Sequence, residues 1–128
     1  SAIARYIPRV KHDHKDAILD CVPNTKIKLM RPVGGRITSE RVSSCDYSVI
    51  MWSVDSNDWK YKTPAGNSEN IDTIVNNVMS GLKEGSIILM HDYIGYHSPT
   101  PEALALFIPI LLERGYQFAV VSDLIGSK

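Results

Sequence analysis

The amino-acid sequence predicts an α/β fold in which parallel strands are joined by crossover helices. The run Ser86–His91 is almost wholly apolar, which is typical of a buried strand in a parallel sheet. Just before it, apolar residues recur at steps of three and four over Ile71–Leu82, which predicts an amphipathic helix. Strands that alternate with helices in this way imply a parallel sheet with right-handed crossovers.

The composition indicates one globular domain or a fragment of one. The chain has 128 residues, of which 44% are apolar, so it can form a buried core. The 14 basic and 14 acidic residues cancel, which argues against a nucleic-acid or polybasic membrane surface. Because the sequence starts at Ser1 rather than Met, we expect an upstream segment to have been removed. Cys21 and Cys45 form no metal-type pair, and we expect two ordinary buried thiols.

Turn residues divide the chain into its predicted elements. Pro and paired Gly end regular structure, β-branched and aromatic residues favour strands, and Thr-Pro-Glu is typical of a helix start. The first part of the chain is expected to form a helix from Pro8 to about Pro23, a strand Ile27–Met30, a loop Arg31–Gly35, a helical turn at Ser39–Glu40 and a strand Tyr47–Trp52. A polar loop Asp55–Asn67 should follow, then a helix capped by Asn67 or Ser68 with Gly85 just past its end, and then the strand Ser86–His91. The last part should form a helix from a Thr100 cap to Gly115 with a kink at Pro109, a strand Tyr116–Val121 and a final turn at Ser122–Leu124.

Polar side chains follow three successive strands and therefore fall at one edge of the predicted sheet. They are Arg31 after the first strand, Asp55, Asp58 and Trp59 after the second, and His91 and Asp92 at the end of the third. The carboxyl edge of a parallel sheet is where ligands and catalytic groups collect. Each group also has a purely structural explanation. His91 and Trp59 can be core residues, Arg31 can form a surface ion pair, and Asp55 and Asp58 can be turn-forming residues.

Three segments together resemble a known family. Arg31-Pro32-Val33-Gly34-Gly35, Trp52-Ser53-Val54-Asp55-Ser56-Asn57-Asp58-Trp59 and Ile88-Leu89-Met90-His91-Asp92 are similar to the third, fourth and fifth motifs of the polysaccharide deacetylases with the NodB homology domain, carbohydrate esterase family 4. The likeness is strongest to bacterial peptidoglycan N-acetylglucosamine deacetylases. It covers nearly the whole chain, and the segments His97–Thr100 and Gly115–Phe118 agree as well.

The resemblance implies a distorted (β/α) barrel with a divalent metal, usually zinc, whose bound water attacks the acetamide carbonyl of an N-acetylglucosamine unit. It also implies a role for six residues of this chain. The resemblance makes His91 the general acid that protonates the departing amine, and Asp58 the carboxylate that supports the charged imidazole. It makes Arg31 the residue that holds carboxylates in the site, and Gly34 a backbone donor to the oxyanion. Leu89 and Trp59 are then walls of the acetyl pocket and of the sugar groove.

Two features depart from the family pattern. The first motif, with the base and a metal-ligand aspartate, and the second, a His-x-x-x-His metal pair, are absent from the sequence. His12 and His14 are two apart and diverge by about 200° on a helix, so they do not replace that pair. In the third motif, Val33 and Gly34 stand where the family usually has proline and an aromatic, and the loss of the ring removes part of the groove wall.

These departures predict that residues 1–128 are the C-terminal half of the barrel domain. We expect the N-terminal half, as a separate chain or swapped segment, to supply the base and all the zinc ligands, since half a barrel leaves sheet edges unpaired. The substrate is then an N-acetylglucosamine polymer, peptidoglycan first and chitin or a chitooligosaccharide as the alternative. Such a protein is expected to be bacterial and extracellular or attached to the cell surface.

Two readings from other classes stay open. A non-catalytic NodB-like module that binds glycan or a partner would explain the missing ligands, and zinc content with acetate release would distinguish it from the enzyme. An unrelated doubly wound binding domain is the second. No glycine-rich phosphate loop follows a predicted strand, which argues against a nucleotide site in such a domain.

Overall fold

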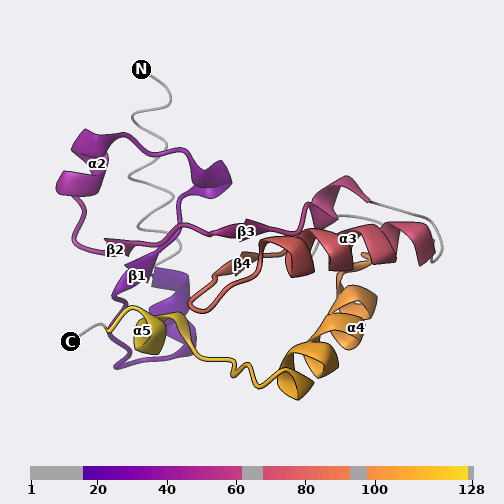
Figure 1. Ribbon diagram of the computed structural model, residues 1–128. Helices are drawn as coiled ribbons and strands as arrows, with labels where there is room; N and C mark the ends of the chain where they lie inside the picture. The colour runs from indigo at the N-terminus through magenta and orange to yellow at the C-terminus, as the bar shows by residue number, and fades with distance from the viewer. Residues whose placement is uncertain (1–15, 62–67, 93–97, 127–128) are drawn as a thin grey trace. The chain divides into compact units, whose positions relative to one another are not determined.

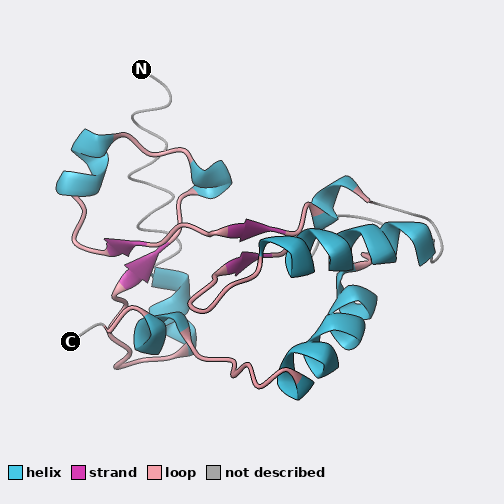
Figure 2. Ribbon diagram, in the orientation of Figure 1, coloured by secondary structure: helices cyan, strands magenta, loops and turns pink. Residues whose placement is uncertain are grey.

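A computed structural model describes residues 16–61, 68–92 and 98–126 of the chain. The chain divides into two compact units, Ser1–Ile50 and Met51–Lys128. Figure 1 labels their helices and strands. Helices and short parallel strands occur in both, as the α/β class requires (Figure 2). None of the helices in the described ranges is both long and apolar enough to cross a membrane.

The first unit contains the parallel pair β1 (Leu29–Met30) and β2 (Ser48–Val49). A helix over residues 16–21 precedes them, and it ends just before Pro23 as predicted. Between the strands lie η1 (Val33–Gly35) and α2 (Ser39–Ser43). The hydroxyl of Thr38 accepts a hydrogen bond from the Arg41 amide and so caps α2 at its N-terminus.

The second unit is organised around the parallel pair β3 (Val54–Asp55) and β4 (Ile88–Leu89). Val54 faces Ile88 and Asp55 faces Leu89 in the register of this pair. The predicted strand Tyr47–Trp52 is therefore wrong in its extent, because regular pairing covers only Ser48–Val49 and resumes at Val54. Asp55 belongs to β3 rather than to the polar loop, since its neighbour Val54 is buried against α3 and the backbone pairs with β4.

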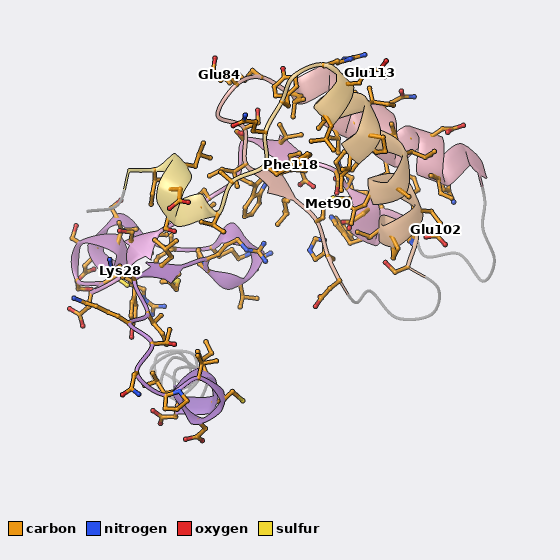
Figure 3. All side chains as sticks on the ribbon, turned by 90° about the horizontal axis from the view of Figure 1, so that it is seen from below. Lys28, Glu84, Met90, Glu102, Glu113 and Phe118 are labelled. Carbon is orange, nitrogen blue, oxygen red and sulfur yellow. The ribbon has the colours of Figure 1, made fainter. Side chains whose placement is uncertain are left out.

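Helices α3 (Ser68–Gly81) and α4 (Thr100–Glu113) pack on each other and form the core of the second unit. Val78 on α3 and Phe107 and Leu111 on α4 are the buried centre. Around it pack partly buried apolar residues of both helices, of β4 and of the chain after α4, namely Val75, Met79, Leu82, Ile88, Met90, Leu104, Ile108 and Tyr116. In Figure 3, Glu102 and Glu113 mark the two ends of α4, and Met90 lies beside that helix.

The ends of α4 follow from local sequence. Pro101 lies in the first turn, where the missing amide hydrogen carries no penalty, and the helix continues through Pro109. At the other end, Gly115 has a φ of +86° and its amide donates to Leu112, while the Tyr116 amide donates to Leu111. This is the Schellman arrangement, in which a left-handed glycine closes the helix.

Two further expectations are corrected. The predicted strand Tyr116–Val121 is not formed in the described residues, where Tyr116–Val120 is irregular and α5 (Val121–Leu124) follows. A strand needs a hydrogen-bonded neighbour, and no described segment pairs with this stretch. The two cysteines are free, but Cys21 is exposed and Cys45 only partly buried, because the first unit does not enclose them.

The burial pattern of α4 yields a stability prediction. Leu111 is 1% exposed in the core and Leu112 is 56% exposed, so they are a matched pair on one helix. Leu111→Ala should lower the free energy of unfolding by about 2–5 kcal/mol, because it leaves a cavity. Leu112→Ala should change it by about 0.5 kcal/mol or less. Urea unfolding of the two variants checks this, and equal losses would contradict the assigned packing.

Candidate active site

The segment after β3 turns sharply, and side-chain hydrogen bonds hold the turn. Asp55 Oδ1 accepts from the Asn57 amide at 2.9 Å, and Asn57 adopts a left-handed φ of +56°. The buried Ser56 hydroxyl donates to the Leu89 carbonyl at 2.8 Å and accepts from the Asp58 amide at 3.3 Å. Asn77 on α3 also donates to the Ser56 carbonyl. The turn is thereby tied to β4 and α3, and it delivers Asp58 at the start of η2 (Asp58–Lys60).

Asp58 is a fully buried carboxylate with a complete set of donors. Within the described residues it accepts four hydrogen bonds, two on each oxygen. Oδ1 accepts from the Trp59 amide at 2.9 Å and faces His91 Nδ1 at 2.8 Å. Oδ2 accepts from the His91 amide at 2.7 Å and from the Thr100 hydroxyl at 2.7 Å. Such a set offsets much of the cost of burying a charge.

These contacts determine the charge of Asp58. Burial by itself raises the pKa of the carboxyl, but the hydrogen bonds from the Thr100 hydroxyl and from the side chain and amide of His91, with the charge of that ring, outweigh burial. The pKa of Asp58 is lowered from its usual value of 3.8. Asp58 is therefore an anion at neutral pH.

An anionic Asp58 also determines the state of the His91 ring. A carboxylate can only accept hydrogen bonds, so Nδ1 of His91 must carry the hydrogen between the two groups. This leaves Nε2 as the nitrogen that can gain or lose a proton. The His91 side chain is 33% exposed, whereas that of Asp58 is fully buried, so the ring connects an internal anion with the surface.

The two predicted wall residues of this unit differ in exposure. Trp59 is 46% exposed, which excludes the alternative that it is a core residue, and the Lys60 ammonium lies 5.4 Å from its ring centre. Leu89 is buried in β4, and its carbonyl is held by Ser56. Asp92 is exposed beyond His91. The structure thus brings Asp58, Trp59, Leu89 and His91 together around one turn.

Arg31 and Gly34 belong to the first unit, so their predicted roles in the site stay predictions. Arg31 is exposed, and Pro32 beside it is buried. Gly34 has a φ of +62°, a conformation that suits glycine and disfavours the aromatic usual in the family. Gly34 is also exposed, so its backbone is accessible in that unit.

The described residues do not form a metal site of their own. In the ranges 16–61, 68–92 and 98–126, no three His, Cys, Asp or Glu side chains are grouped closely enough to hold an ion. His12, His14 and His97 lie outside these ranges. The donor set that a catalytic divalent ion requires, three protein ligands and an open position, is thus not supplied by this part of the chain.

Sequence reasoning missed the role of Thr100. We predicted a helix cap, but Thr100 is the first residue of α4, and Pro99 before it forms no side-chain cap. The Thr100 hydroxyl is instead directed to Asp58, and the residue is 5% exposed. The only indication in the sequence was its position in the segment His97–Thr100, which agrees with the family but carries no catalytic motif.

Comparison with known proteins places this geometry in a family. The chain is 32% identical over 99 residues to the peptidoglycan-N-acetylglucosamine deacetylase PgdA of Listeria monocytogenes, and 34% over 105 residues to one from Bacillus cereus. It is 33% identical over 107 residues to the peptidoglycan-N-acetylmuramic acid deacetylase PdaC of Bacillus subtilis. These matches cover 77%, 78% and 84% of this chain, but only 19%, 46% and 21% of the relatives. No protein-family model matches the chain.

Solved structures agree with the sequence relatives. A family 4 acetyl xylan esterase from Clostridium thermocellum, in complex with a cobalt ion, superimposes with a TM-score of 0.71 at 29% identity. A family 4 pseudoenzyme from Bacillus anthracis gives 0.65 at 29%. The chain is covered to 86% and 84%, but it spans only 50% and 36% of those chains. These sequence and structural matches place the chain in carbohydrate esterase family 4. The chain belongs to the polysaccharide deacetylases of this family and corresponds to their C-terminal part.

The lowered pKa of Asp58 gives a pH-dependent stability prediction. A group whose pKa is lower in the folded state contributes stability above its unfolded pKa and loses it as pH falls through the folded value. The stability advantage of the wild type over Asp58→Asn should therefore be full above pH 3.8 and shrink below it. Urea unfolding at a series of pH values measures the difference. Asp92→Asn, at an exposed position, should stay close to wild type throughout, and a pH-independent deficit for Asp58→Asn would contradict the assignment.

Proposed function

We propose that this chain carries the proton-donating half of the active site of a carbohydrate deacetylase, which hydrolyses the acetamide of N-acetylglucosamine units in peptidoglycan. The observation that carries the proposal is the contact between the buried Asp58 carboxylate and Nδ1 of the partly exposed His91. Relatives named as peptidoglycan deacetylases support the substrate class. A chitin or chitooligosaccharide substrate is the alternative within the same chemistry.

The reaction adds the oxygen of water to the acetamide carbonyl carbon and breaks the bond from that carbon to nitrogen. Acetate and a free amine are the products, and the amine nitrogen needs a proton as it leaves. Doubly protonated His91 can supply it from Nε2, because Nδ1 is held by Asp58. The Asp58 anion stabilises the imidazolium before transfer and keeps the ring oriented afterwards, through its contact with Nδ1.

The remaining site residues have roles that follow from their chemistry and family position. Trp59 offers an exposed ring for the face of a sugar, and Leu89 an apolar wall for the acetyl methyl. Arg31 would hold carboxylates of the site in place, and the Gly34 amide would donate to the oxyanion. These four assignments are part of the proposal, together with the catalytic pair His91 and Asp58.

The proposal requires a divalent ion, zinc or another metal, held by ligands of the N-terminal half, outside this chain. When bound, such an ion supplies water activation and polarises the carbonyl. The cobalt complex of the Clostridium thermocellum esterase supports a metal requirement. We further propose that residues 1–128 form the C-terminal half of a distorted (β/α) barrel, completed by an N-terminal half that is continuous, swapped or separate. The solved relatives, about twice as long, support this.

The location follows from the substrate. Peptidoglycan lies outside the bacterial cell membrane, so an enzyme that modifies it is proposed to be extracellular or attached to the cell surface. A non-catalytic glycan-binding module is the second candidate function, and two observations favour it. The described residues hold no metal cluster, and a family 4 pseudoenzyme is among the structural neighbours.

His91→Ala tests the proposal directly. General acid catalysis contributes about 10²- to 10⁴-fold, so turnover should fall by about that much. Metal content should be unchanged, because His91 is assigned no ligand role. Acetate release from N-acetylglucosamine oligomers and from peptidoglycan, with metal analysis of the same samples, gives both values. Wild-type protein that binds no metal and releases no acetate would favour the glycan-binding module, and loss of metal in the variant would refute the role of His91.

The composition of the active protein is a separate prediction. Intact-mass analysis of the purified, active material should reveal more polypeptide than the 128 residues, either as a second species or as one longer chain. The missing base and metal ligands are the reason. A folded, active preparation that contains only the 128-residue species would contradict the proposed half-barrel.

A further inference from the structure

The Thr100 hydroxyl contacts Asp58 but has no part in the proton transfer proposed above. Its Oγ1 lies 2.7 Å from Asp58 Oδ2, and the residue is 5% exposed. Ser98 lies on its other side, with its hydroxyl 3.1 Å from Thr100 Oγ1. The Thr100 amide also donates to Ser98 Oγ at 3.4 Å. A line of four side chains therefore runs from Ser98 through Thr100 and Asp58 to His91.

The direction of every hydrogen in this line follows from the charge of Asp58. An anionic carboxylate has no hydrogen to give, so the Thr100 hydroxyl must donate to it. Its single hydrogen is then used, and Thr100 Oγ1 can only accept from the Ser98 hydroxyl. Ser98 Oγ in turn accepts from the Thr100 amide. As long as Asp58 is charged, these hydrogen bonds have only one possible set of donors and acceptors.

The anchor of Thr100 is rigid. Thr100 starts α4, and Ala103, Phe107 and Leu111 along this helix are buried. The hydroxyl is thus held from the core, whereas Asp58 lies on a short 3₁₀ turn. A side chain fixed on a packed helix can set the orientation of a group on a less regular segment.

We propose that Thr100, oriented by Ser98, is a positioning residue that holds Asp58 Oδ2 and so presents Oδ1 to His91 Nδ1, fixing the ring with Nε2 toward the substrate. This inference rests on the proposed deacetylase function for its kinetic consequence, but not for its structural one. Without the Thr100 hydroxyl, Oδ2 keeps only the His91 amide as donor among the described residues. The carboxylate can then rotate, and its contact with Nδ1 loosens.

Other charged groups also lie on the elements near Asp58. They are Asp55 in β3, Lys60 in η2, Asp92 after His91 and Glu102 on α4. Asp55 accepts from the Asn57 amide, and Lys60 lies over the Trp59 ring. A changed pH profile in a Thr100 variant therefore reports first on the Asp58–His91 pair, because Thr100 contacts Asp58 directly.

The experiment compares Thr100→Val with Thr100→Ser in the complete, active protein. Valine keeps the shape and removes the hydroxyl, whereas serine keeps the hydroxyl. Thr100→Val should lower kcat about 10- to 100-fold, the value of one hydrogen bond to a charged group, with KM changed by about threefold or less. The alkaline limb of its pH–rate profile should move to lower pH, since the charged imidazole is less well stabilised. Thr100→Ser should recover kcat to within about threefold of wild type.

Two NMR measurements test the structural part without reference to activity. The titration of the Asp58 carboxyl carbon should move upward in pH in Thr100→Val, because a donor to the anion is lost. The ring nitrogens of His91 should change from mainly Nδ1–H to a mixture of tautomers. Ser98→Ala should shift both in the same direction by a smaller amount, and it serves as the second variant where Thr100→Val does not fold.

The outcomes separate the two proposals. Unchanged nitrogen shifts and Asp58 titration in both Thr100→Val and Ser98→Ala would overturn the positioning role, whatever the activity. A loss of kcat in Thr100→Val that serine does not recover, with an unmoved pH profile, would also overturn it, since that is the pattern of a purely structural residue. Wild-type protein without deacetylase activity would refute the proposed function alone, and the NMR shifts would still decide the role of Thr100.

Discussion

A single buried carboxylate sets the conditions for the rest of the second unit. An anion at Asp58 that is fully removed from water is tolerated only with donors around it. Those donors come from η2 itself, from the end of β4 and from the start of α4, positions separated by up to 42 residues. η2, the end of β4 and the start of α4 must therefore meet at the Asp58 carboxylate. The hydrogen bonds that hold them there belong to the fold as well as to the site.

Apolar packing joins the elements whose ends carry these polar contacts. Val78 on α3 and Phe107 and Leu111 on α4 join the helices, and Ile88 and Met90 extend that packing to β4. Val54 packs against α3 at Gly81, where a side chain Cβ would lie 3.6 Å from Val54. Apolar packing is non-directional, so it brings the ends of η2, β4 and α4 only roughly together. The directional hydrogen bonds to Asp58 then determine how the side chains at these ends are oriented. A loss in the core would reach His91 through this route.

The sequence predicted those parts of the unit that depend on periodicity and turn residues. The helix Ser68–Gly81 follows from apolar spacing over Ile71–Leu82, and the helix Thr100–Glu113 from its Thr-Pro-Glu start and from Gly115. The apolar run predicted a strand at Ser86–His91, and regular pairing covers Ile88–Leu89 within it. Asp58 and His91 were named from their positions after two strands. The strand predicted at Tyr116–Val121 failed because a strand also depends on a neighbour, which local sequence does not specify. Thr100 was missed because a threonine before Pro101 is typical of a cap, and its contact with Asp58 bridges 42 residues.

In the proposed site, the His91–Asp58 pair and the metal ligands have different structural requirements. Stabilising an imidazolium needs a carboxylate within hydrogen-bond distance, and one unit of this chain supplies both partners with their supports. Holding a metal needs several ligands converging on one point, and the described residues offer no such group. The proposed proton donation therefore requires only contacts within Met51–Lys128, whereas the proposed water activation would require other residues. The state of the Asp58–His91 pair is then a property of this unit, and it can be measured before the metal-binding residues are known.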